Sequence, residues 1–480
     1  MRTRYARPAD GAPAPPKRLR DRSRDPSVLA DLRTETSRSI LIRGGTVLSQ
    51  DPEVGDLVRG DVLITGRKIA AVGPDLREEA TDAILVDASD AIVLPGFVDC
   101  HVHGWEGQLR GSAPIIDFEG YLRLTAFGYG PLYTPHDNYV GTLRTALTAL
   151  DAGYTTIIDN SNNSRTPDHS NAAVEALIDA GIRGVHASGI PVHTEVPTWP
   201  RDVERLRSEY VSTEDQLVTL RLFDPAPTEH VWQFAKDHDL WMSHETASYY
   251  DALLPDLAAK GLLTDKHTYN HCIDLADQTW AMIARSGATV NICPRSEPTF
   301  GPGGGYPPTE KMREFGVRPG MSGDNEISYA LNPFAEMQTL LTTDRAKIIR
   351  RGYHGERDLP RHLTAEDLLE FATLRGAANA ALEAKTGSLT PGKEADIVLV
   401  RTTDLNTAPV NTALATVTTF AHPGNVDTVF VAGQVRKFRG ELVGQDLDAL
   451  RGLVESSRDR LAAAQRQTKP PSTNRVWPVT

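Results

Sequence analysis

The amino-acid sequence predicts an α/β fold, a (β/α)8 TIM-type barrel with a small β-sandwich domain built from both ends of the chain. Between residues 92 and 385, short apolar runs alternate with amphipathic helical stretches, the pattern of a parallel sheet with crossover helices. Both flanks are instead rich in short strands separated by glycine turns. The length of 480 residues exceeds what one ordinary core organises, which suits a large barrel with an accessory domain.

Eight apolar runs are the expected barrel strands. They lie at residues 92–98, 154–158, 184–186, 217–223, 240–242, 268–272, 289–293 and 317–321. Helical periodicity at residues 170–180, 229–237 and 274–284 separates several of them, which favours a closed barrel. The alternative is an open doubly wound sheet, but no glycine-rich phosphate loop follows the first strand.

Composition divides the chain into four parts. Residues 1–38 hold ten Lys or Arg against five Asp or Glu without apolar periodicity, so we expect a mobile arm. Residues 39–91 and 386–445 carry the strands of the β-sandwich domain. Residues 92–385 form the barrel, and residues 446–480 form a C-terminal helix and tail.

Charge and cysteine content exclude several classes of protein. The formal net charge of −12 argues against a nucleic-acid partner, because tracking phosphates needs a surplus of Lys and Arg. No run of about 18 apolar residues could span a membrane, and the N-terminal segment lacks the apolar core of a secretory signal. The three cysteines are too few for a disulfide framework. We therefore expect a cytoplasmic protein with no membrane partner and a small neutral or cationic substrate.

Histidine and aspartate residues follow four of the expected strands at the end where barrel enzymes place their chemistry. His101 and His103 are separated by one residue, so on an extended chain both imidazoles point the same way. His244, His271 and Asp324 each come just past another apolar run. Three imidazoles and one carboxylate with an open position are typical of a catalytic divalent metal, zinc first, with Fe(II), Mn or Co as alternatives.

Two longer motifs carry a family resemblance. Residues 94–103, LPGFVDCHVH, and residues 387–396, GSLTPGKEAD, resemble the first-strand signature and the returning turn of the amidohydrolase superfamily. The branch it resembles contains cytosine, guanine and adenosine-type deaminases and triazine hydrolases. The resemblance implies His101, His103, His244 and Asp324 as metal ligands, with His271 beside the substrate.

The same resemblance implies one metal and a general base. Binuclear members bridge two metals with a carbamylated lysine after strand four, but this chain has no lysine between Lys68 and Lys236. We therefore expect one divalent ion, with Asp324 as ligand neighbour and general base to the activated water.

One departure from the family concerns the proton donor. Deaminases of this branch place a Glu three residues after the strand-five histidine, and counting from His244 gives Ala247. Glu245 adjoins His244, but neighbouring side chains on a strand face opposite ways, which points it away from the activated water. Glu106 and Glu326 are the replacement donors, and Glu245 stays among the candidate catalytic residues with Glu106. A missing donor suits a leaving group that departs as an anion, such as chloride or nitrite.

Residues that could contact the substrate are predicted from their positions after the expected strands. Trp105, Glu106 and Gly107 lie where triazine hydrolases have an aromatic residue followed by Glu or Gln, and Gln108 comes next. Asn160 lies in an asparagine-rich turn after the second strand. We expect Trp105, Gln108, Asn160 and His271 to bind a small heteroaromatic substrate. We also expect a homo-oligomer, as in similar proteins.

The predicted function is that of a mononuclear hydrolase. It adds metal-activated water to a ring carbon of a nitrogen heteroaromatic and expels an amino, chloride or nitrite substituent. An alternative is hydrolytic opening of a cyclic amide such as an imidazolone. A non-catalytic scaffold on the same fold is the third possibility, which the complete set of expected ligands disfavours. The sequence leaves the substrate, the leaving group and the metal open.

Overall fold

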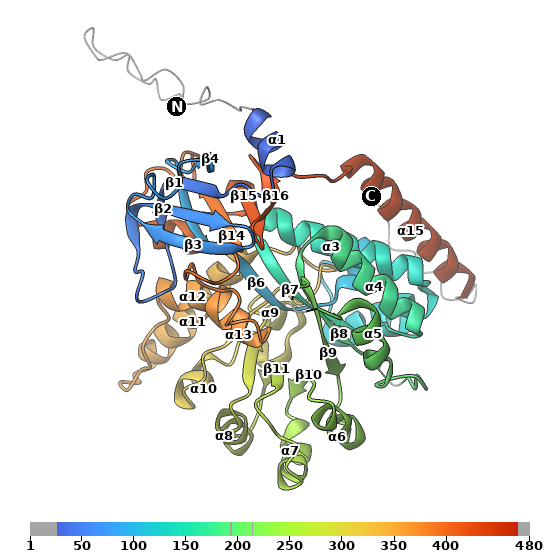
Figure 1. The fold of residues 1–480 in the computed structure, drawn as a ribbon. Coiled ribbons are helices and arrows are strands. Elements are labelled where there is room, and N and C mark those ends of the chain that lie inside the picture. The colour runs from blue at the N-terminus through green and yellow to red at the C-terminus, as the bar shows by residue number, and fades with distance from the viewer. Residues whose placement is uncertain (1–25, 193, 214, 469–480) are drawn as a thin grey trace, which may run out of the picture.

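A closed parallel barrel forms the centre of the molecule in the computed structural model, which describes residues 26–192, 194–213 and 215–468 (Figure 1). Its strands are β6 (Phe97–Val102), β7 (Tyr154–Ser161), β8 (Arg183–Ser188), β9 (Val218–Asp224), β10 (Met242–Ala247), β11 (His267–Ile273), β12 (Thr289–Ile292) and β13 (Gly320–Met321). They pair in chain order, and a parallel bridge between Val102 and Asp324 joins the first strand to the segment after the last. The predicted (β/α)8 barrel is confirmed.

Helices surround this barrel on its outer side (Figure 1). The longer ones are α3 (Pro135–Ala152), α4 (Pro167–Ala180), α5 (Asp202–Tyr210), α6 (Glu229–Asp237), α7 (Tyr250–Ala259), α8 (Asp277–Ser286), α11 (Pro333–Tyr353) and α12 (Ala365–Ala372). Short helical segments over the loops are η2 (Gly104–Leu109), α2 (Phe118–Leu124), η3 (Thr125–Tyr129), η4 (Gly130–Leu132), α9 (Ser296–Phe300), η5 (Pro302–Gly305), α10 (Thr309–Glu314), α13 (Leu374–Asn379), α14 (Ala413–Ala415), η6 (Thr416–Phe420) and η7 (Pro423–Asn425). Local sequence fixes several ends: α3 begins with a capping box between Thr134 and Asp137 and ends at left-handed Gly153.

Strands from both ends of the chain form one nine-stranded mixed sheet. They are β1 (Ile40–Val47), β2 (Leu57–Thr65), β3 (Lys68–Gly73), β4 (Ile84–Asp87), β5 (Ala91–Pro95), β14 (Ile397–Arg401), β15 (Val426–Val431), β16 (Gln434–Phe438) and β17 (Glu441–Leu442). β5 lies between β1 and β14, so the N-terminal and C-terminal strands meet in the middle of the sheet. Both ends of the chain therefore build the accessory domain, as the sequence predicted.

The expected first barrel strand, residues 92–98, is divided between the two sheets. Its first part is β5, which pairs with β14, and its second part begins the barrel strand β6. The chain changes sheets at Gly96, where an added Cβ would lie 2.0 Å from Thr155 Oγ1. Continuous apolar sequence concealed this change because both halves are buried.

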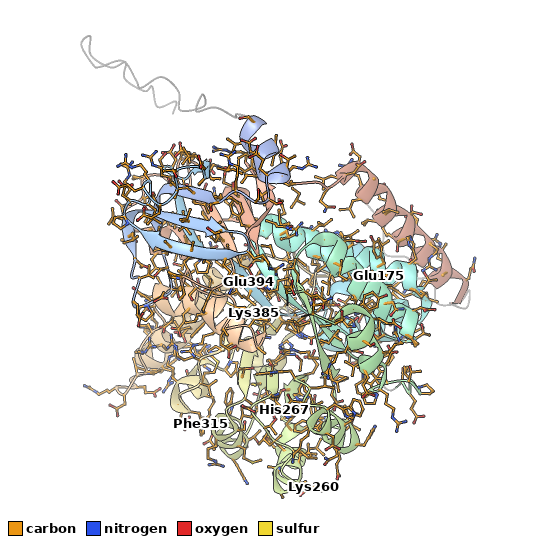
Figure 2. All side chains as sticks on the ribbon, viewed as in Figure 1. Glu175, Lys260, His267, Phe315, Lys385 and Glu394 are labelled. Carbon is orange, nitrogen blue, oxygen red and sulfur yellow. The ribbon has the colours of Figure 1, made fainter. Side chains whose placement is uncertain are left out.

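Buried ion pairs join the terminal sheet to the barrel. Arg183 at the start of β8 is buried, and its guanidinium donates to Asp396 Oδ2 at 2.7 Å and to Glu394 Oε2 at 2.6 Å. Glu394 lies where the sheet meets the barrel in Figure 2. The charges are paired within the protein, so this junction is structural.

Helices at both ends of the described chain pack on the body. Residues 26–34, expected in the mobile arm, instead form α1 (Pro26–Thr34), whose Leu32 is buried with the core of the terminal sheet. Residues 1–25 lie outside the described residues. α15 (Leu447–Thr468) covers α3 and η2, and residues 469–480 are outside the description. Among the described residues, none of the helices has the length and apolar character needed to cross a bilayer.

Candidate active site

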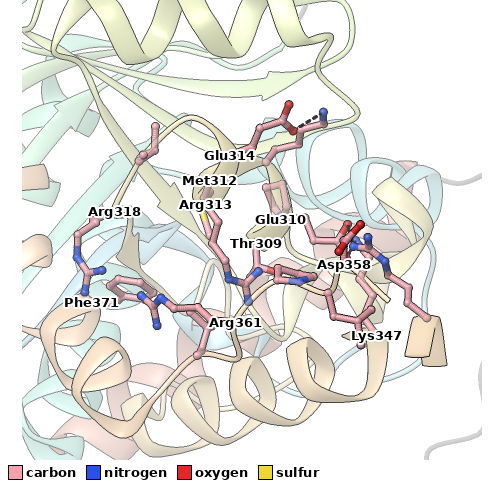
Figure 3. Close-up of a pocket in the computed structure, with 18 residues that line it drawn as sticks. Thr309, Glu310, Met312, Arg313, Glu314, Arg318, Lys347, Asp358, Arg361 and Phe371 are labelled. Carbon is pink, nitrogen blue, oxygen red and sulfur yellow. Dashed lines mark hydrogen bonds and ion pairs between the residues drawn. The ribbon is translucent and has the colours of Figure 1, made fainter. Parts of the chain in front are cut away.

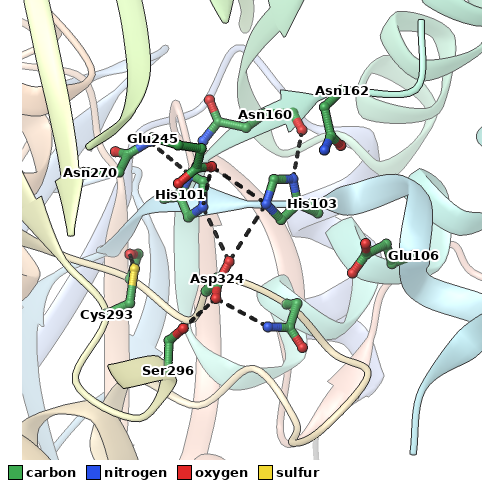
Figure 4. A network of polar contacts seen from close by, with 12 residues as sticks. His101, His103, Glu106, Asn160, Asn162, Glu245, Asn270, Cys293, Ser296 and Asp324 are labelled. Carbon is green, nitrogen blue, oxygen red and sulfur yellow. Dashed lines mark hydrogen bonds and ion pairs between the residues drawn. The ribbon is translucent and has the colours of Figure 1, made fainter. Parts of the chain in front are cut away.

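The two histidines at the end of β6 face one space at the mouth of the barrel (Figure 4). His101 is fully buried, His103 is 6% exposed, and their ring centroids are 4.8 Å apart. His103 Nδ1 lies 3.1 Å from the backbone oxygen of Asn160. The side-chain amides of Asn160 and Asn270 approach His101 Nδ1, the latter at 3.0 Å. The Nδ1 atoms of both histidines thus contact protein groups on the side away from the site, and their Nε2 atoms point into the site.

Asp324 reaches the same space from the segment after β13. Its backbone N–H donates to the oxygen of His101 at 2.9 Å, and the N–H of His103 donates to its oxygen at 2.8 Å. Asp324 Oδ1 lies 3.2 Å from His101 Nε2 and 3.6 Å from His103 Nε2. Burial alone would raise the pKa of this carboxyl, but His101 and His271 hold it below the usual range. Asp324 is therefore ionised and can accept a proton.

Strand β10 contributes Glu245 to the site and turns His244 away. Ser243 faces the barrel interior, where its hydroxyl accepts from Arg221 at 3.2 Å. Side chains alternate between the two faces of a strand, so residues two positions apart share a face. Glu245 therefore faces inward like Ser243. Glu245 Oε1 lies 3.3 Å from His101 Nε2 and 3.7 Å from His103 Nε2.

His244 instead lies on the outer face of the barrel wall. Its Nε2 is 2.8 Å from His267 Nδ1, and its ring packs against Trp232 of α6 with centroids 4.7 Å apart. The structure thus does not bring His244 to His101 and His103, which corrects its expected role as a metal ligand. His244 and Glu245 face opposite ways, as the sequence predicted. However, Glu245 faces the barrel interior and His244 faces outward, which is the reverse of the prediction.

His271 completes the cluster by departing from the strand pleat. His271 and Cys272 have positive φ values of 63° and 55°, which turn the end of β11. His271 Nε2 then lies 3.1 Å from Glu245 Oε2, and its Nδ1 lies 3.2 Å from Glu297 Oε1. Burial alone would lower the pKa of His271, but Cys293 and the two carboxylates raise it well above the usual value. His271 thus lies between two acidic side chains, which favour its protonated form.

Several buried polar atoms in this cluster fit a divalent metal ion. His101 Nε2 and Glu245 Oε1 are buried without a hydrogen-bond partner. Potential ligand atoms of His101, His103 and Glu245 lie within 4.8 Å of one another, as do those of His101, His271 and Asp324. Buried polar atoms without partners are rare, and a cation would satisfy both of these.

The amide of Asn160 can prepare His101 for such an ion. Its oxygen has no partner, whereas its nitrogen is beside His101 Nδ1. A half-turn of the amide lets this oxygen accept from a protonated Nδ1 and leaves the lone pair on Nε2. Asn160 therefore positions a histidine, and it is absent from the pocket wall where substrate contact was expected.

Glu106 is close to the site but is not on the surface of the pocket. It is fully buried, and Tyr121 Oη donates to its Oε1 at 2.8 Å. Burial raises the pKa of Glu106 well above the usual value. Tyr121 lines the pocket, so Glu106 acts on this space through the tyrosine hydroxyl rather than by direct contact.

Trp105 and Gln108, expected to bind substrate, serve the structure behind the pocket. Trp105 Nε1 donates to Asn162 Oδ1 at 2.6 Å, so it holds an asparagine that does line the pocket. Gln108 Nε2 donates to the oxygen of Asp137 at 3.0 Å and to Ser457 Oγ at 3.2 Å. Gln108 thus joins η2 to α3 and α15 and points away from the site.

A pocket of about 290 Å3 opens directly onto this cluster. His103, Glu245, His271 and Asp324 form one end of its wall. A larger cavity of about 1030 Å3 beside α10 contains none of these residues (Figure 3). Its Arg313, Arg318 and Arg361 are paired with acidic side chains of the same region. The smaller pocket, where polar groups converge, is the candidate active site.

Sequence reasoning missed residues that orient the site. Glu297 contacts His271, Ser296 Oγ donates to Asp324 Oδ2 at 2.5 Å, and Asn270 contacts His101. Asn270 had a sequence signal, because it is a polar residue two positions after Thr268 and therefore lies on the same face of the strand. Ser296 and Glu297 lie on a short helix after β12, where the sequence had no comparable pattern.

Comparison with known families agrees with this geometry. The model of the Amidohydrolase family matches residues 92–436, which include the whole barrel. The chain belongs to this family. The resemblance predicted from residues 94–103 and 387–396 is thereby confirmed, and the chain is a hydrolase.

Relatives of this amidohydrolase extend over most of its length. A 5-methylthioadenosine/S-adenosylhomocysteine deaminase from Pyrococcus abyssi is 26% identical, with 85% of this chain and 96% of the relative covered. An enzyme of the same name from Symbiobacterium thermophilum is 27% identical, with 82% and 93% covered.

Solved structures show the same fold. A zinc-bound adenosine deaminase from Xanthomonas campestris has a TM-score of 0.75 at 22% identity, with 89% of this chain and 99% of that chain covered. A variant of atrazine chlorohydrolase from Arthrobacter aurescens, complexed with zinc and atraton, has a TM-score of 0.76 at 22% identity, with 87% and 100% covered.

Proposed function

We propose that this amidohydrolase removes an exocyclic amino group from a small nitrogen heteroaromatic ring by hydrolysis, using one divalent metal ion, with zinc as the first choice. The observation that carries the proposal is the convergence of Glu245, His271 and Asp324 around His101 Nε2 in a pocket. The deaminase names of its relatives and the zinc bound in structures of the same fold support it.

The ligands of the ion in this proposal are His101, His103, Glu245 and Asp324. Glu245 takes the place that the sequence gave to His244, because only Glu245 points toward the two β6 histidines. If Glu245 is the Glu that the family places three residues after its strand-five histidine, the histidine position is Met242. Met242 is fully buried in the core, so β10 offers the site a carboxylate and no imidazole.

When bound, a divalent ion supplies Lewis acidity and lowers the pKa of a coordinated water to about 7. Asp324 is ionised and accepts the proton of the attacking water. Glu245 and Glu297 favour the protonated form of His271, which can donate to a ring nitrogen or to the departing amine. Glu297 holds the imidazole at Nδ1, and Glu245 lies beside Nε2. The proton that Asp324 takes from the water can replace the one that His271 gives up, since ligand atoms of Asp324 and His271 lie within 4.8 Å of each other.

Glu245 also changes the expected leaving group. The preference for chloride or nitrite rested on Ala247 and a missing carboxylate. Glu245 provides a carboxylate beside His271, and an amine needs such proton transfer more than a halide does. Chloride release remains the second candidate, supported by the fold shared with atrazine chlorohydrolase. Opening of a cyclic amide has no comparable support.

Product analysis tests the proposal. Purified protein loaded with zinc is offered matched amino, chloro and nitro derivatives of purine, pyrimidine and triazine rings. Ammonia release with appearance of the oxo product is expected for at least one amino compound. Chloride or nitrite release alone would replace deamination with the second candidate, and no release from any ring would refute the function. A homo-oligomeric assembly and a cytoplasmic location stay predictions.

A further inference from the structure

The wall of the candidate pocket has two unlike parts. One end holds the ionisable cluster of His103, Glu245, His271 and Asp324. The remainder is made mostly by carbon, including the side chains of Phe118, Tyr121, Leu122, Phe223, Ile273 and Phe300. The Tyr121 ring is 5.1 Å from that of Phe300 and 6.4 Å from that of Phe118, so these aromatic groups form a continuous surface.

Each neutral polar side chain on this wall makes at least one hydrogen bond within the protein. Ser296 Oγ donates to Asp324, and Thr246 Oγ1 donates to the oxygen of His244 at 3.3 Å. Tyr121 Oη donates to Glu106, and Tyr249 Oη donates to the oxygen of Pro225 at 3.0 Å. Asn162 uses its oxygen to accept from Trp105. Among the described residues that line the pocket, none is Lys or Arg.

We propose that the substrate ring carries an uncharged apolar substituent, such as an alkyl or aryl group, rather than a hydroxylated, phosphorylated or carboxylated one. This inference rests on the proposed function of the same site. Reactive ring atoms face the ionisable cluster, and the substituent lies against the aromatic surface. A substituent with hydroxyl groups would lose water against the aromatic surface and gain few matched partners. An anionic one would meet no Lys or Arg among the described residues there, and His271 belongs to the ionisable cluster that faces the reactive ring atoms.

A pair of compounds that differ only in hydroxyl groups tests this directly. We would compare 9-propyladenine with 9-(2,3-dihydroxypropyl)adenine, and the corresponding propylamino and dihydroxypropylamino derivatives of an aminotriazine. An apolar pocket disfavours one added hydroxyl by about 10²-fold in kcat/KM. We expect the propyl member of the accepted ring to be preferred by at least that factor. Equal use of both members, or preference for the hydroxylated one, would overturn the inference.

Binding measurements keep this test separate from the test of catalysis. Calorimetric titration of the zinc-loaded protein with the same four compounds does not depend on turnover. Tighter binding of the propyl members without ammonia release would refute the proposed function and support the apolar pocket. Binding of none of the four, or tighter binding of the hydroxylated members, would overturn the apolar pocket.

Phe300 offers a matched pair of variants. It is buried at the end of α9 and packs against Tyr121. Phe300→Gln places a hydrogen-bonding amide on the apolar surface and should lower the propyl-to-dihydroxypropyl ratio by about tenfold. Phe300→Leu removes the ring but stays apolar, and it should keep the ratio of the unchanged protein. The same ratio in all three proteins would contradict the assignment of this surface to the substituent.

Discussion

Strands β6 and β10 each bring a pair of polar residues to the end of the barrel, but the pairs differ in spacing. His101 and His103 are two residues apart, so both share one face whatever the register of the strand. His244 and Glu245 are neighbours, so exactly one can face inward, and the register decides which. Two polar residues separated by one position on a strand are therefore predicted to share a site. For two adjacent polar residues, the sequence predicts that one faces the site but not which one.

The largest expected effect comes from the pair that spacing predicts well. Replacing both His101 and His103 by Ala removes half of the proposed ligands. Affinity for zinc should fall by far more than the 10- to 100-fold typical of losing an outer partner, and turnover should vanish with it. Metal content after dialysis and ammonia release measure the two effects. Retained zinc in the double variant would remove β6 from the metal site.

Asp324→Asn tests the proposed general base, whose carboxylate lies beside the histidines of β6. An amide cannot accept the proton of the attacking water, so kcat should fall on the order of 10²–10⁴-fold. Circular dichroism of the same preparation checks that the fold is kept. A loss of less than tenfold would place the general base elsewhere in the cluster.

Asn160→Ala removes a side-chain contact that positions His101 but leaves all four proposed metal ligands in place. Asn160 contacts His101 Nδ1 by its amide and His103 Nδ1 by its backbone oxygen, and the substitution removes only the amide. Zinc affinity should fall by about 10- to 100-fold. Gln108→Ala is the control, because Gln108 points toward α3 and α15 and should leave zinc affinity unchanged. Equal affinities in both variants would contradict the positioning role.

Outside the barrel wall, His244 and His267 should affect stability at low pH rather than catalysis. Burial lowers the pKa of His267 to about 4, below the usual 6.5 of an unfolded chain. The neutral form therefore contributes full stability above pH 6.5, and this contribution is lost as pH falls toward 4. Its total is on the order of 3 kcal/mol.

Urea unfolding between pH 7 and 4 in the presence of a chelator measures this loss. His267→Gln should flatten the dependence of the free energy of unfolding on pH. His230→Gln, at an exposed position on α6, should keep the slope of the unchanged protein. Equal slopes in all three would show that His267 does not titrate with unfolding.

Much of the architecture follows from patterns that depend on sequence neighbours. Apolar runs and helical periodicity indicated eight barrel strands, but the run at 92–98 lies mostly in β5 and the run at 240–242 shares only Met242 with β10. The motif before His101 located the first two proposed ligands.

Alternation placed His244 and Glu245 on opposite faces of β10 but did not show which face is the inner one. Met242 belongs to the outer core with Trp232, and Ser243 accepts from Arg221 inside the barrel. The choice between the two faces needs these partners on α6 and β9, whose positions relative to β10 the sequence does not give.

Other parts of the site depend on contacts that no local pattern encodes. Positive φ at His271 and Cys272 turns an imidazole that a regular pleat would have aimed differently. The change of sheet at Gly96 depends on the approach of Thr155, about sixty residues away in the chain. Gln108 was assigned to substrate from its place in a motif, but Asp137 and Ser457 determine its direction.

Cobalt binding to two single variants tests the central claim most directly. Glu245→Ala and His244→Ala are each titrated with Co²⁺, and the visible absorption reports how the ion is coordinated. If Glu245 is the β10 ligand, Glu245→Ala changes the spectrum and weakens binding by at least 10²-fold, beyond the effect of an outer partner. His244→Ala then keeps both the spectrum and the affinity of the unchanged protein. An altered spectrum and lost affinity in His244→Ala, with Glu245→Ala unaffected, would contradict the account.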